Sequence, residues 1–223
     1  NLLMMKFILT CTIIFLTLSM KPGKKTKIIF FGDSITQMGI NKGGYIDRIQ
    51  TALNDKKIAH QYQLIGAGVG GNKVYDLYLR LEEDVLSRKP DVVVIWVGVN
   101  DVWHKTSGTG TDIEKYEKFY IALIKKMQAK KIKLVLTTPA AIGERYDGTN
   151  LQDKDLDAYS AVIRKLSTQF NCKLVDLRMV FMQYEKEHNT ANRESGMLTT
   201  DRVHLNEKGN QLVADQMWEA LKN

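Results

Sequence analysis

Cysteine and proline are scarce in this chain of 223 residues, which contains two cysteines and three prolines. Cys11 lies in an apolar N-terminal segment, so a chain that loses this segment keeps Cys172 alone and has no disulfide framework. The absence of a C-x-x-C pair and of any histidine and cysteine cluster leaves no motif for a metal site. Without a Ser/Gly/Pro-rich stretch there is no recognisable linker, and a single domain is predicted.

The sequence also lacks an apolar run long enough to cross a bilayer. The longest run, residues 7–20, follows Lys6 and precedes the polar segment KPGKKTK. It is shorter than the roughly 18–20 apolar residues that a span requires, so it favours a signal peptide, with an uncleaved N-terminal anchor as the alternative. We therefore predict a leader over residues 1–22, a domain over residues 23–223 without an integral membrane segment, and export to the periplasm or beyond.

A basic surface of the kind that binds nucleic acid is missing as well. The formal net charge is +7, but the 32 lysines and arginines are scattered among 25 acidic residues. Their densest groups lie at the leader junction and at a helix end, where solvated lysines are usual. Because no basic face with interleaved aromatic residues is visible, no nucleic-acid partner is expected.

What the sequence does contain is a regular alternation of strand and helix patterns. Short apolar runs predict strands at 27–31, 60–66, 91–98, 133–139 and 173–177. Amphipathic periodicity predicts helices at 44–55, 74–89, 112–130, 156–170 and 206–223. This alternation is typical of an α/β fold in which a parallel sheet is covered by helices on both faces.

In such sheets, ligands bind beyond the carboxyl ends of the strands. Ser34 follows the first predicted strand, Gly70–Gly71 the second, and Asn100–Asp101 the third, while the polar stretch 137–150 follows the fourth. These segments are therefore expected to meet at one edge of the sheet.

Ser34, in FFGDSITQMG, is either a helix cap in a turn or a nucleophile. A nucleophilic serine needs a base within hydrogen-bond reach and a group that orients the base. Among four histidines, His204 lies three residues after Asp201, a spacing at which one tight turn brings the carboxylate to Nδ1 and leaves Nε2 for Ser34.

An esterase also needs hydrogen-bond donors for the oxyanion that develops on the carbonyl oxygen. The N–H groups of Ser34 and Gly71 and the side-chain amide of Asn100 are candidates, although the glycines could form only a turn and Asn100 only a cap. We interpret the neighbouring Asp33 and Asp101 as hydrogen-bonding residues that hold their loops.

Four segments together resemble the SGNH, or GDSL-type, hydrolases. They are GDSIT, GVGGN, GVND and DRVHLNEKG, which occur in that family's order over nearly the whole chain after residue 26. The resemblance implies a flavodoxin-like three-layer α/β/α sandwich that hydrolyses esters through an acyl-enzyme, with no metal or other cofactor. It also implies that Ser34 is the nucleophile, His204 the base and acid, Asp201 the orienting residue, and Ser34, Gly71 and Asn100 the oxyanion hole.

One motif departs from the family pattern. Many members carry asparagine at the start of the second block, where this chain has IGAGVGG, so the contact made by that asparagine is missing or replaced. The G-x-S-x-G elbow of the α/β-hydrolases does not occur, which argues against that class.

The loops near Ser34 bear on the substrate. Residues 102–112 and 143–150 are mostly small or polar, and Trp103 and His104 are available to contact a sugar, although Trp103 could serve only in packing. We therefore expect an acetyl or short-acyl esterase whose partner is an oligosaccharide or small-molecule ester. The alternatives are a lysophospholipase, thioesterase or arylesterase and, in a different class, a catalytically silent carbohydrate-binding protein on the same fold.

Overall fold

A single all-parallel sheet forms the centre of the protein. The computed structural model describes residues 23–222, so the predicted leader lies outside the described residues. The strands are β1 (Thr26–Gly32), β2 (Tyr62–Gly68), β3 (Val92–Trp96), β4 (Lys133–Thr137) and β5 (Lys173–Val175), in the order β2-β1-β3-β4-β5. This is the flavodoxin-like strand order, in which the chain reverses direction across the sheet between β1 and β3. The predicted fold class is confirmed.

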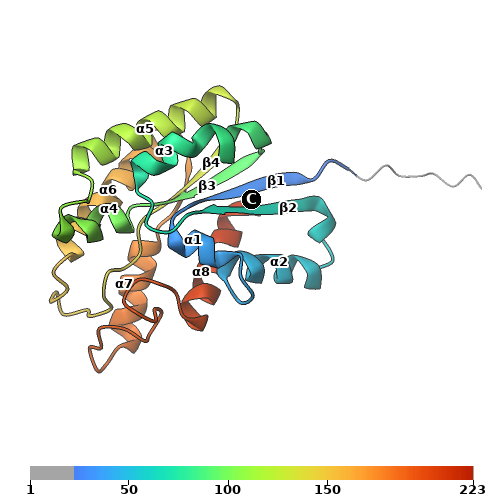
Figure 1. Cartoon of the computed structure of the whole chain (residues 1–223). Helices are drawn as coiled ribbons and strands as arrows, with labels where there is room; N and C mark the ends of the chain where they lie inside the picture. Colours follow the sequence, from blue (N-terminus) through green and yellow to red (C-terminus); the bar gives the residue numbers. More distant parts are fainter. Residues whose placement is uncertain (1–22, 223) are drawn as a thin grey trace, which may run out of the picture.

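Helices cover the sheet on both faces. The α-helices are α1 (Ser34–Gly39), α2 (Tyr45–Asp55), α3 (Val74–Asp84), α4 (Val99–Trp103), α5 (Ile113–Ala129), α6 (Asp153–Gln169), α7 (Leu177–His188) and α8 (Glu207–Leu221). Figure 1 shows α3 and α5 together on one face and α2 and α8 on the other. Short 3-10 helices occur at Ala59–Gln61, Leu86–Arg88 and His104–Ser107.

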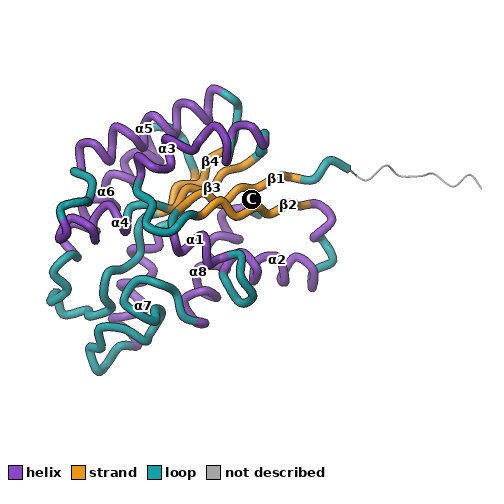
Figure 2. Tube along the Cα trace, in the orientation of Figure 1, coloured by secondary structure: helices purple, strands orange, loops and turns teal. Residues whose placement is uncertain are grey.

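The core lies between these layers. The central strands β1 and β3 are buried on both faces, as expected for apolar runs of β-branched and aromatic residues in a parallel sheet. Gly32, the last residue of β1, pairs with Gly68 of β2 and with Trp96 of β3. Three strands therefore end level with one another, and the loops that follow them start from one edge of the sheet. Figure 2 shows long loops gathered on the side of the molecule away from the start of β1.

Several predicted boundaries were wrong. The second strand occupies Tyr62–Gly68 rather than 60–66, because its glycines continue to pair with β1 instead of starting a turn. The helix predicted over 74–89 ends at Asp84 and is followed by a separate 3-10 turn that closes at Lys89, which has a left-handed backbone (φ 49°). The helices α1, α4 and α7 were not predicted.

Two further features concern membranes and thiols. Within residues 23–222, none of the helices is both long enough and apolar enough to pass through a membrane. Cys172 is half-buried next to β5, and burial raises the pKa of its thiol to about 11. A thiol with a raised pKa is a poor nucleophile, so Cys172 serves in packing.

Candidate active site

Ser34 and His204 are in contact although 170 residues separate them in the chain. The Oγ atom of Ser34, the first residue of α1, lies 3.0 Å from Nε2 of His204. Asp33 caps this helix, because its Oδ1 accepts a hydrogen bond of 3.0 Å from the N–H of Ile35. The turn after β1 thus begins a helix and also presents the serine hydroxyl to an imidazole.

Asp201 holds the other side of that imidazole. Its Oδ2 lies 2.7 Å from Nδ1 of His204, and its Oδ1 accepts hydrogen bonds from the backbone N–H groups of His204 (2.8 Å) and Val203 (3.2 Å). Partial burial acts to raise the pKa of Asp201, but the hydrogen bonds from His204 and Val203 bring it below its usual range. An ionised carboxylate only accepts hydrogen bonds, so Nδ1 carries the proton and Nε2 is free to accept one from Ser34.

The structure also brings the other predicted residues to this edge. Gly71 has a left-handed backbone (φ 75°), and its surroundings are open, with no atom within 4 Å of the position a Cβ would take. Asn100 lies in α4, is 3% exposed, and donates one amide hydrogen to the carbonyl of Asn72 at 3.1 Å. Within residues 23–222, no acceptor bonds the N–H of Ser34 or of Gly71. In the described part of the chain, these two backbone donors and the second amide hydrogen of Asn100 are therefore unused.

Asp33 and Asp101 form hydrogen bonds as predicted. Asp33 caps α1. Asp101 anchors the start of α3, since both of its carboxylate oxygens accept from the N–H of Val74 (3.2 and 3.3 Å). Burial raises the pKa of Asp33 to about 7 and that of Asp101 to about 6, although their hydrogen bonds oppose the change. Both carboxyls are thus costly to ionise where they lie.

Arg80 of α3 supports this edge and was not predicted. Its guanidinium donates to the carbonyl oxygens of Gly32 (2.7 Å) and Ala67 (3.1 Å), and its Nε donates to Oδ1 of Asn72 (2.7 Å). One side chain therefore ties the ends of β1 and β2 to the segment after Gly71, and it supplies support in the block where the family asparagine is absent. Its only sequence signal is the i,i+4 pairing with Asp84 (2.6 Å).

Glu144 is a second supporting residue that sequence reasoning missed. It is fully buried, and its carboxylate accepts hydrogen bonds from the backbone N–H groups of Met197 (2.8 Å), Leu198 (2.6 Å) and Thr199 (2.6 Å). These bonds fix the segment just before Asp201. A charged residue directly after the apolar PAAIG was the available signal.

Trp103 and His104 lie at the end of α4 with their rings 6.0 Å apart and tilted by 36°. Trp103 is partly buried against the core, and partial burial together with the charge of Lys73 lowers the pKa of His104. A groove of about 380 Å³ is bordered by Ile35, Thr200 and Leu205, the chain neighbours of Ser34, Asp201 and His204. It is lined by Ile35, Met38, Asn41, Lys42, Gly43, Gly44, Thr200, Leu205, Asn206, Glu207 and Asn210.

Comparison with known proteins identifies the family. The model of the GDSL-like lipase/acylhydrolase family matches residues 30–212. The chain belongs to this family. Within it, the chain is 28% identical over 212 residues to an acetylxylan esterase of Geobacillus stearothermophilus, with 87% of this chain and 93% of the relative covered. It is 27% identical over 233 residues to the uncharacterized lipoprotein YqeF of Bacillus subtilis, with 94% and 95% covered.

Solved structures agree with this assignment. The crystal structure of an acetyl xylan esterase, AlAXEase, has a TM-score of 0.87 and 60% sequence identity to this chain, covering 87% of it and 99% of its own chain. The family and the fold predicted from the four motifs are therefore confirmed, as is the class of carboxylic ester hydrolase.

Proposed function

We propose that this protein is an acetyl or short-acyl esterase that acts on an acylated carbohydrate through an acyl-enzyme. The observation that carries this proposal is the continuous contact from Ser34 Oγ to His204 Nε2 (3.0 Å) and from His204 Nδ1 to Asp201 (2.7 Å). The substrate class is supported by the relatives described as acetylxylan esterases.

In the proposed reaction, Oγ of Ser34 attacks the ester carbonyl while Nε2 of His204 takes the hydroxyl proton. Asp201 keeps Nδ1 protonated and stabilises the imidazolium that forms. The imidazolium then gives its proton to the leaving sugar oxygen, which departs as a free hydroxyl and leaves an acyl group on Ser34. Nε2 of His204 then takes a proton from water, which attacks the acyl-enzyme; the imidazolium returns this proton to Oγ of Ser34 as the carboxylic acid is released.

The oxyanion would be held by the N–H groups of Ser34 and Gly71 and by the Asn100 amide. These donors are free, and Asn100 is fixed by its bond to Asn72, so they cost little reorganisation when charge develops. This assignment predicts a large effect of Asn100 on kcat.

The carbohydrate would lie across the polar surface around Ser34. Trp103 and His104 offer aromatic rings at the end of α4, and the groove beside Asp201 and His204 offers asparagine amides and apolar side chains. Export would follow from the leader pattern of residues 1–22, which has the short apolar run of a signal peptide.

A panel of p-nitrophenyl esters from C2 to C12, assayed beside acetylated xylan and pectin oligosaccharides, tests the proposal. We expect the highest kcat/KM for the acetyl ester, release of acetate from an oligosaccharide, and a loss of about 10⁴-fold or more in Ser34→Ala. Ser87 is an exposed serine in the 3-10 helix Leu86–Arg88, which follows α3. Ser87→Ala is the matched control and should retain wild-type activity.

Two results would contradict parts of this proposal separately. A maximum at C8 or longer would replace the carbohydrate esterase with a lysophospholipase or thioesterase, leaving the mechanism intact. Equal rates in wild type and Ser34→Ala would remove Ser34 as the nucleophile.

A further inference from the structure

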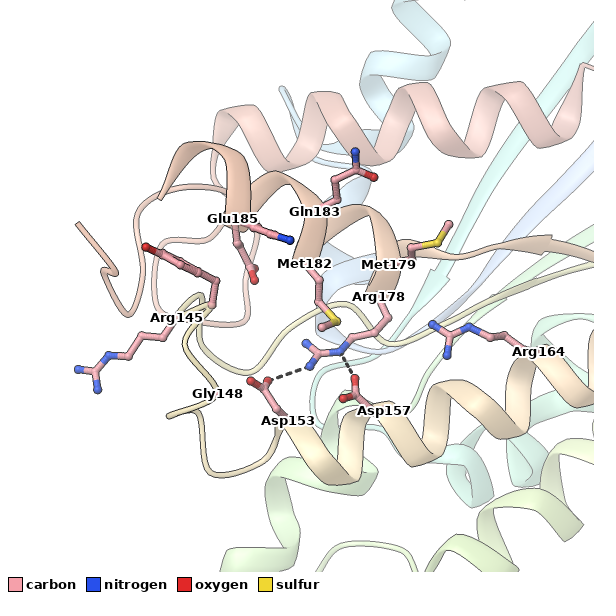
Figure 3. Close-up of a pocket in the computed structure, with 12 residues that line it drawn as sticks. Arg145, Gly148, Asp153, Asp157, Arg164, Arg178, Met179, Met182, Gln183 and Glu185 are labelled. Atoms are coloured by element: carbon pink, nitrogen blue, oxygen red, sulfur yellow. Dashed lines mark hydrogen bonds and ion pairs between the residues drawn. The ribbon is translucent and has the colours of Figure 1, made fainter. Parts of the chain in front are cut away.

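A cavity of about 670 Å³ lies between α6, α7 and the loop 145–148, in a part of the molecule that the proposed reaction does not use. Figure 3 shows that its walls carry arginines and carboxylates from both helices, together with two methionines of α7. Its volume is in the range of sites that hold small organic ligands.

The side chain of Glu185 on this wall has an unused polar atom. Glu185 is 2% exposed, and its buried Oε1 has no hydrogen-bond partner among residues 23–222. Burial raises the pKa of this carboxyl to about 8, against the opposing charge of Arg178. A protonated carboxyl presents one O–H donor and retains acceptor capacity, and a buried polar group without a partner calls for a ligand or water to bond it.

Arg178 forms the polar base of the cavity. It is 2% exposed, and it donates to Asp157 (2.7 Å), Asp153 (2.9 Å) and the carbonyl of Ala140 (3.2 Å), as the dashed contacts in Figure 3 show for the two aspartates. A guanidinium has five N–H donors, so two have no acceptor among the described residues.

Two aspartates against one arginine leave the base of the cavity with no excess positive charge with which to select an anion. Of the other cations that line the cavity, Arg164 is paired with Asp176 (2.6 Å), Arg145 lies 3.9 Å from Glu194, and Lys186 is exposed.

Apolar surfaces complete the site. Met179, Met182 and Tyr146 are 58%, 44% and 46% exposed at its walls and rim. Sugar rings present hydroxyl groups at their edges and C–H groups on their faces, and they match a site of fixed planar polar groups next to methionine and aromatic surfaces. We propose that this cavity is a second carbohydrate-binding site, which holds a neutral oligosaccharide segment of the substrate polymer; this inference rests on the proposed function.

The cavity is connected to the candidate active site through its own loop. Glu144, which precedes Arg145 at the rim, bonds the segment before Asp201, and the N–H of Gly143 donates to the carbonyl of Arg202 at 2.9 Å. A polymer long enough to reach from the cavity to Ser34 would raise the effective concentration of its acyl groups there. This increase in effective concentration is expected only for substrates long enough to occupy both sites.

Methionine methyl groups give a site-specific test. The Ser34→Ala protein, labelled with ¹³C at its methionine methyls, is titrated with unsubstituted xylohexaose. Met179 and Met182 report on the cavity, whereas Met38 reports on the groove beside His204. We expect saturable shifts of the first two signals, with a Kd that rises at least about tenfold in Glu185→Leu while the Met38 signal titrates as before.

Two other variants keep the test decisive. Tyr146→Ala changes only an exposed side chain and should weaken the same Kd severalfold even if Glu185→Leu does not fold. Glu114→Leu, at an exposed position of α5 that does not line the cavity, should change nothing. Static Met179 and Met182 signals at millimolar xylohexaose, or the same Kd in Glu185→Leu and Tyr146→Ala as in their parent, would overturn the second site. Failure of the esterase proposal is seen independently in the hydrolysis assays.

Discussion

At the scale of single residues, the amide of Asn100 makes one structural hydrogen bond and has a second hydrogen for the proposed oxyanion contact. One hydrogen is bonded to Asn72 in the segment after Gly71, and the residue is almost fully buried in a helix of only five residues. This bond couples two of the three proposed oxyanion donors, since it links α4 to the loop that carries the Gly71 N–H. Because the amide group is planar, the hydrogen bond to Asn72 also fixes the direction of the second amide hydrogen.

We predict that Asn100→Ala lowers kcat on p-nitrophenyl acetate by about 10²–10³-fold, because a preorganised donor to the oxyanion is lost. KM should change little, since the donor acts mainly on charge that develops after binding. Asn54→Ala, at an exposed position of α2, is the control. A kcat within threefold of wild type, in a variant with an unchanged Tm, would exclude Asn100 from the oxyanion hole.

At the scale of elements, the helices that sequence patterns missed are informative. The five residues of α4 and the six of α1 are too few to show a period of 3.6. The motifs GVND and GDSIT therefore predicted candidate site residues but no helices. In α7 the period is obscured because Met179 and Met182 face outward, while Arg178 and Glu185 are buried. The missed helix α7 thus lines the cavity proposed as a binding site, and there the apolar residues are exposed while the charged residues are buried.

The packing of α1 against β2 depends on Gly68. A Cβ at this position would lie 2.1 Å from the N atom of Gln37 and 2.6 Å from the carbonyl oxygen of Asp33, both of which are backbone atoms of the α1 turn. Side-chain rotation cannot relieve such contacts. The glycine therefore sets how closely the helix that carries Ser34 approaches the sheet.

We predict that Gly68→Ala moves α1 away from β2 and destabilises the protein by about 1–3 kcal/mol, as overpacking does. The Ser34 hydroxyl should also be displaced from His204, so kcat should fall by tenfold or more. Thermal unfolding and ester hydrolysis measure the two effects. Gly23→Ala, where a Cβ meets no atom within 4 Å, should leave both unchanged. Wild-type kcat in Gly68→Ala would show that this packing does not position Ser34.

At the scale of the whole molecule, parallel topology explains what could be predicted. Strands of one sheet that run in one direction end at one edge, so Ser34, Gly71 and Asn100 could be grouped from the sequence alone. The segment of Asp201 and His204 follows no strand, and its place depends on Glu144, which no motif identifies. Contact distances, the support from Arg80 and the raised carboxyl pKa values likewise depend on packing between segments far apart in the sequence.

Three buried carboxyls make the stability of the whole chain dependent on pH. Burial raises the pKa of Asp33 to about 7, of Asp101 to about 6 and of Glu185 to about 8. Between about pH 4 and pH 8 the folded chain holds protons that the unfolded chain has released, so the free energy of unfolding decreases as the pH rises. The lowered pKa values of Asp176 and Asp201 act in the opposite direction, but only below about pH 4.

We predict that urea denaturation gives a lower free energy of unfolding at pH 8 than at pH 5. Asp33→Asn should reduce this difference, because asparagine can still cap α1 but carries no proton to lose. For Asp33 the change from its ordinary value of 3.8 to about 7 corresponds to about 4 kcal/mol, an upper limit for this residue's share. Asp55→Asn, at an exposed position at the end of α2, should retain the wild-type slope. A free energy of unfolding that is constant or rises from pH 5 to pH 8 would mean that these carboxyls are ionised in the folded chain at neutral pH, with the cost of their burial met by the hydrogen bonds around them.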